Sequence, residues 1–146
     1  MINKITKESL LELTLKIPIT ILGDGERPKL AKLYLDMWNL FKCAYRDGEN
    51  NGHGESHIYH VLRRGIDITI AMHGYREIYY LPRLNHRPDY FTGYLMLGLA
   101  VFTHDMYSDI DRERHHLHAQ QFIDRLAYIN TTTGGGEDAY STENLL

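Results

Sequence analysis

Residues Tyr94-Leu95-Met96-Leu97-Gly98-Leu99-Ala100-Val101-Phe102 form an uninterrupted apolar run, and Thr103-His104-Asp105 follows it directly. The run is too short to cross a membrane and long for one buried strand, so it predicts a helix buried on nearly all sides. A histidine and an aspartate at the end of such a helix need partners, because an unpaired buried carboxylate is costly. The pair is satisfied either by a hydrogen bond within an ordinary core or by a divalent metal ion that both side chains bind.

The composition is that of an ordinary globular protein. With 146 residues, of which 43% are hydrophobic and 24% charged, the chain is expected to form one domain spanning residues 1–146. The net charge of −3 gives no electrostatic reason to expect binding to nucleic acid or to an anionic membrane. The single cysteine, Cys43, excludes an internal disulfide and suits a reducing, cytoplasmic location. Its thiol is expected to be buried, because it lies in an apolar helical pattern.

Apolar residues recur at spacings of three and four over most of the chain, which predicts an all-α bundle of five or six helices. A strand through 15–22 is an alternative for the end of the first helix, because this segment is rich in β-branched residues. Residues 75–88 are expected to form a loop with a short helical piece. The predicted helices span residues 7–17, 28–46, 57–73, 89–105 and 112–129.

A metal site is one interpretation of the histidines. His57 begins one predicted helix and the His104-Asp105 pair ends another, so a compact helical domain can bring the three side chains together. Two imidazoles and a carboxylate are a suitable ligand set for zinc, manganese or iron. A helical protein whose histidines simply pack in the core is the alternative.

The spacing of these residues resembles the HD-domain metal-dependent phosphohydrolases. That family places a histidine early in a helix, with a valine one turn later, and a His-Asp pair at the end of a hydrophobic helix. The resemblance covers roughly residues 50–125. It rests on His53-Gly54-Glu55-Ser56-His57, on Val61 and on His104-Asp105.

The resemblance implies an HD-like all-α fold and a divalent ion, manganese, cobalt, zinc, iron or magnesium, bound by His57, His104 and Asp105. It also implies hydrolysis of a phosphate ester in a nucleotide or another small phosphorylated metabolite. The family normally adds a last metal ligand, an aspartate on a later helix. Asp138 is the preferred candidate here, and the alternatives are Asp124, His115, His116 or a site that has lost its metal. A degenerate module that binds a nucleotide or a protein partner without turnover is the competing function.

Further roles follow for residues near the motif. His53 lies where a histidine of the similar cyclic-nucleotide phosphodiesterases protonates the leaving group, which predicts a general acid. Asp109, just past the His-Asp pair, is a candidate for orienting the attacking water. Arg63 and Arg64 are candidates for phosphate contacts, because arginine can bind phosphate through two hydrogen bonds. His115 is a further candidate for substrate binding, and the oligomeric state is left open.

Overall fold

The computed structural model describes residues 4–45, 54–73, 83–84, 87–106 and 113–133, and it confirms the all-α prediction. A short 3-10 helix, η1 (Lys42–Ala44), extends the second α-helix. Two strands of two residues each, β1 (Arg83–Leu84) and β2 (Arg87–Pro88), pair antiparallel within the segment expected to be a loop. The α-helices of the described part are α1 (Lys7–Thr14), α2 (Glu26–Phe41), α3 (Glu55–His73), α4 (Tyr90–Thr103) and α5 (His115–Thr133).

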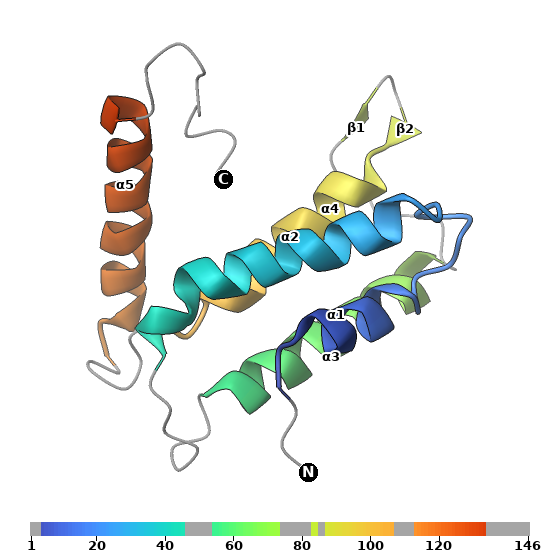
Figure 1. Cartoon of the computed structure of the whole chain (residues 1–146), viewed down its shortest axis with the longest axis horizontal. Helices are drawn as coiled ribbons and strands as arrows, with labels where there is room; N and C mark the ends of the chain where they lie inside the picture. The colour runs from blue at the N-terminus through green and yellow to red at the C-terminus, as the bar shows by residue number, and fades with distance from the viewer. Residues whose placement is uncertain (1–3, 46–53, 74–82, 85–86, 107–112, 134–146) are drawn as a thin grey trace.

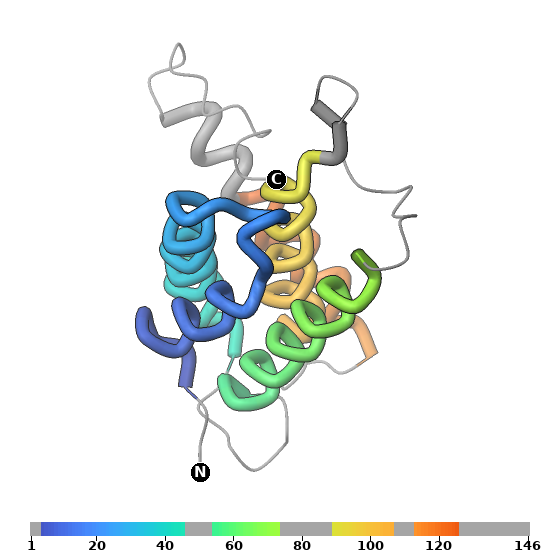
Figure 2. The backbone as a smooth tube through the Cα atoms, turned by 90° about the vertical axis from the view of Figure 1, so that its right-hand side faces the viewer, coloured from blue at the N-terminus to red at the C-terminus, as the bar shows by residue number. Residues whose placement is uncertain are grey.

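Four of these helices form two layers. Figures 1 and 2 show α2 and α4 in one layer and α1 and α3 in the other, and α1 contacts α2 while α3 contacts α4. The three largest fully buried side chains, Tyr34, Tyr94 and Phe102, lie on α2 and α4, and Ile58 and Leu62 of α3 belong to the same core cluster. The core therefore fixes how the end of α4 sits relative to α3.

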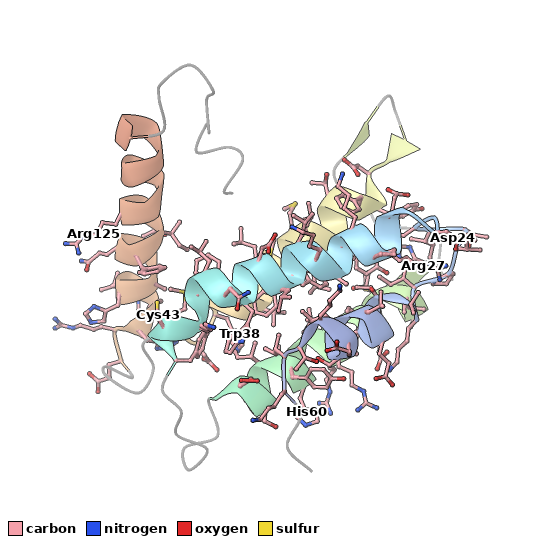
Figure 3. The ribbon with its side chains drawn as sticks, viewed as in Figure 1. Asp24, Arg27, Trp38, Cys43, His60 and Arg125 are labelled. Carbon is pink, nitrogen blue, oxygen red and sulfur yellow. The ribbon has the colours of Figure 1, made fainter. Side chains whose placement is uncertain are left out.

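The segment 15–22 is a series of turns, so the strand alternative is wrong. Its apolar residues are explained by burial of Ile17 and Leu22 in the core. Arg27 of α2 holds the turns, because its guanidinium donates to the carbonyl oxygens of Leu15 at 3.4 Å and Ile17 at 3.3 Å. The same side chain pairs with Asp24 at 2.6 Å (Figure 3).

The expectation that the apolar helix is buried on nearly all sides is wrong. α4 buries one face, on which Tyr94, Gly98, Val101 and Phe102 lie, whereas Met96 is 51% exposed. The physical reason is that α2 and α3 pack against α4 in a two-layer arrangement, and Met96 and Ala100 remain exposed.

The first turn of α3 is tied to the N-terminal segment. The helix begins at Glu55, two residues before the predicted start, and the Glu55 carboxylate accepts a hydrogen bond from the backbone N–H of Ile5 at 2.9 Å. His57 therefore lies inside a helical turn that is anchored on both sides: by this contact and by buried Ile58.

The last helix, α5, stands beside the end of α2 in Figure 1, where the ring of Phe122 lies 6.0 Å from that of Phe41. The Cys43 thiol, expected to be buried, is exposed, because it follows α2 on the outer side of η1. Within the described ranges, none of the helices combines the length and apolarity that crossing a membrane requires.

Candidate metal centre

The structure brings together His57, His104 and Asp105. The Nε2 atom of His57, in the first turn of α3, lies 3.1 Å from Oδ2 of Asp105. The Nε2 atom of His104, the C-cap of α4, lies 3.1 Å from the same oxygen. One ligand atom from each residue falls within a sphere in which all separations are at most 4.8 Å, so the group could hold a metal ion.

The hydrogen bonding of His104 shows which ring nitrogen faces the centre. Nδ1 of His104 lies 2.7 Å from the carbonyl oxygen of Val101. A carbonyl oxygen only accepts, so Nδ1 carries a proton, and in a neutral ring this leaves an Nε2 lone pair facing the Asp105 carboxylate. Two acceptors face each other there unless a proton or a cation lies between them. A backbone carbonyl that fixes the tautomer in this way is the usual partner of a metal-binding histidine.

The distances also fit a metal ion. Nitrogen and oxygen ligands lie about 2.0–2.2 Å from a zinc ion, so neighbouring ligand atoms are roughly 3.0–3.5 Å apart. Both 3.1 Å separations fall in this range. The side chain of Asp105 is only 15% exposed, whereas those of His57 and His104 are 35% and 37% exposed, so a ligand can approach from the histidine side.

Tyr45 holds the last turn of α4, just before His104 and Asp105, and this role was not predicted from the sequence. Its hydroxyl donates to the carbonyl oxygen of Phe102 at 2.7 Å. Burial raises the pKa of Tyr45 above its ordinary value. A hydrogen bond with the Asp105 backbone lowers this pKa, and the charge of the nearby Asp105 carboxylate raises it. In the sequence this tyrosine only continued the apolar stripe of a helix, so no signal distinguished it.

His115 approaches the centre from a third helix. It is the first residue of α5, and its Nε2 atom lies 3.9 Å from Oδ1 of Asp105, the carboxylate oxygen that the other two histidines do not face. His116, the next residue, is exposed and does not belong to the ligand group. Asp124 accepts a hydrogen bond from Gln120 at 3.0 Å on the exposed part of α5, and it does not belong to the group either.

Three candidates from the sequence lie outside the described residues. They are His53, Asp109 and Asp138. Among the described residues, His115 is the candidate that lies nearest to completing the three-residue ligand group.

His57 of the candidate centre also lines a groove of about 520 Å³. The other described lining residues also lie on α3, and Figure 3 labels His60 among them. Arg63 and Arg64, the predicted phosphate contacts, are both exposed in this groove. His60 and Asp67 were not predicted as site residues from the sequence, although their spacing from His57 places them near the same helical face.

We compared the chain with protein-family models, with curated proteins and with solved structures, and none of the three comparisons gave a match. The candidate centre is therefore defined by the geometry of this chain alone. The likeness to the HD-domain family stays a proposal that rests on the short motifs.

Proposed function

We propose that the protein is a metal-dependent phosphohydrolase or phosphodiesterase with an HD-like site, acting on a nucleotide or another small phosphorylated metabolite. The observation that carries the proposal is that His57 belongs both to the three-residue ligand group and to the lining of a groove that holds two arginines. A potential metal ligand, an open approach and cationic side chains thus meet on one surface of α3.

His57, His104 and Asp105 would hold the ion. A divalent ion bound by such residues lowers the pKa of a bound water and neutralises the charge of a phosphate group. Asp105 is suited to the central position, because both imidazole Nε2 atoms face one of its oxygens while His115 faces the other. His115 can therefore act as a further ligand or contact the substrate beside the ion.

The proton and the phosphate are assigned to other residues. Arg63 and Arg64 can donate charge-assisted hydrogen bonds to phosphate oxygens in the groove. The sequence assigns leaving-group protonation to His53, which precedes α3, and water orientation to Asp109, which follows α4. Both assignments rest on sequence position.

A binding module without turnover is the second candidate. It is favoured by the absence of an aspartate that completes the ligand group among the described residues. A site with three close ligands and a histidine at 3.9 Å could retain a metal-bound nucleotide without activating water.

The test is hydrolysis by untagged protein of nucleoside mono-, di- and triphosphates and cyclic nucleotides with manganese, cobalt or zinc. The His104→Ala variant should lose metal binding and turnover, because it removes a ligand whose Nε2 faces Asp105. His116→Ala is the matched control, since it removes an exposed neighbouring histidine outside the ligand group, and it should keep both. Nucleotide binding without turnover of any substrate would favour the binding module instead.

His53 and His57 should behave differently. His57→Ala should abolish metal binding and turnover together. His53→Ala should keep the metal and lower the hydrolysis rate by about 10²–10⁴-fold, the usual effect of removing a general acid. Full activity in the His53 variant would refute the assignment of the proton donor.

A further inference from the structure

We propose that the α3 groove holds a second anionic group of the ligand, so that the substrate is a small molecule with two phosphate groups at separate positions. The inference rests on the proposed function for the first phosphate, which the metal would bind. The second phosphate is assigned to Arg63 and Arg64, which line the groove with His57.

Helix geometry gives the spacing of the two groups. His57 and Arg64 are seven residues apart and share one face of α3, so their Cα atoms are about 10 Å apart along the axis. Long side chains on a helix lean toward its N-terminus, which is the His57 end. An anion held by Arg64 and one held at the metal are thus separated by roughly 5–10 Å. A sugar or short carbon chain that carries a phosphate at each end matches this separation.

The arginines are available for an external anion. Asp67 stands three and four residues beyond them, at spacings where helical ion pairs form. Within the described part of the chain, however, Asp67 forms no ion pair with Arg63 or Arg64. His60 also lines the groove, and its position on α3 lies between those of His57 and Arg64.

Asp67 limits the length of the ligand. Its exposed carboxylate lines the groove beyond the arginines and repels a third anionic group at that position. The same carboxylate accepts hydrogen bonds from a hydroxyl or amino group. This order of charges favours a small bisphosphate over a polyphosphate chain or a nucleic-acid strand.

Two probes that cannot be hydrolysed test the groove: butylphosphonate and butane-1,4-diyl bisphosphonate, titrated calorimetrically into the manganese-loaded full chain. The bisphosphonate should bind at least about 10-fold more tightly, the equivalent of one charge-assisted contact. The double variant Arg63→Gln/Arg64→Gln should remove this preference while manganese affinity stays unchanged. Arg125→Gln on α5 is the matched control, since Arg125 is exposed and lies away from His60 in Figure 3, and it should keep the preference.

The outcomes separate the inference from the proposed function. Equal binding of the two probes, or a preference that survives in the double variant, would overturn the groove inference while metal-dependent hydrolysis could still stand. Failure of manganese to bind the wild-type protein would overturn the proposed function. In that case the arginine pair should still bind butylphosphonate in the chelator-treated protein, and equal binding by the double variant would overturn the groove as well.

Discussion

Replacement of Gly98 by alanine should destabilise the fold, because at this glycine α4 packs directly against the Tyr34 ring of α2. A Cβ atom at position 98 would overlap Cε1 of Tyr34 and would lie 2.7 Å from Cδ1 of the same ring. The Tyr34 ring is fully buried, and its hydroxyl donates to the carbonyl oxygen of Tyr94 at 2.6 Å. The ring cannot move aside without breaking this hydrogen bond or disturbing its edge contact with Phe102, whose ring centroid is 6.1 Å away.

The magnitude follows from three contributions. Overpacking of a core costs about 1–3 kcal/mol, and loss of the tyrosine hydrogen bond costs about 1 kcal/mol more. Alanine offsets about 1 kcal/mol of this through its higher helix propensity. We therefore expect Gly98→Ala to lower the free energy of unfolding by about 1–3 kcal/mol.

Gly65→Ala on α3 is the matched control. The three atoms nearest to its Cβ would belong to the Leu97 side chain, with Cδ1 at 3.0 Å, and that methyl group can shift. The gain in helix propensity then makes this variant neutral or slightly stabilising. Urea unfolding followed by circular dichroism measures both variants, provided that their m values agree with the wild type. A Gly98→Ala protein as stable as the Gly65→Ala protein would refute the packing of α2 against α4.

Two further predictions concern buried polar side chains. Burial raises the pKa values of Tyr34, Tyr45 and Tyr94 above the unfolded value of about 10, so their stabilising effect is complete below pH 10 and is lost as the pH rises further. Unfolding should therefore accompany tyrosinate absorbance in an alkaline titration, and ionisation of all tyrosines in a folded protein near pH 10 would contradict this. Arg27→Met should cost about 1–3 kcal/mol of stability in urea, because the turn carbonyls lose their donor. Lys32→Met, which removes only an exposed ion pair, should change stability by less than about 0.5 kcal/mol. Equal losses of stability in the two variants would argue that the Arg27 hydrogen bonds do not stabilise the turns.

The helices could be predicted from the sequence because apolar residues recur at helical spacing. Their ends were less predictable, since they depend on tertiary contacts. The start of α3 at Glu55 is one example, because the Glu55 carboxylate accepts a hydrogen bond from the backbone N–H of Ile5 in the N-terminal segment. Burial of α4 was overestimated because a run of apolar residues does not reveal how many helices pack around it, and Met96 is exposed.

At the candidate site, the motif spacing correctly led to the proximity of His57, His104 and Asp105. The approach of His115 could not be ranked above that of other residues, because the direction of α5 depends on packing such as the contact between Phe41 and Phe122. The hydrogen bond from Tyr45 to the Phe102 carbonyl oxygen could not be predicted either, because a tyrosine in an apolar stripe gives no indication of what its hydroxyl contacts.

The most direct test of the metal centre is the metal content of untagged protein, measured by inductively coupled plasma mass spectrometry after reconstitution and removal of free ions. The site geometry predicts about one divalent ion per chain, since one ligand group is held around a single Asp105 oxygen. Asp105→Asn should lose the ion, whereas Asp124→Asn, which changes an exposed aspartate on α5 that is outside the group, should keep it. A wild-type protein without bound metal, or an Asp105→Asn protein that retains the ion, would show that His57, His104 and Asp105 do not form a metal centre.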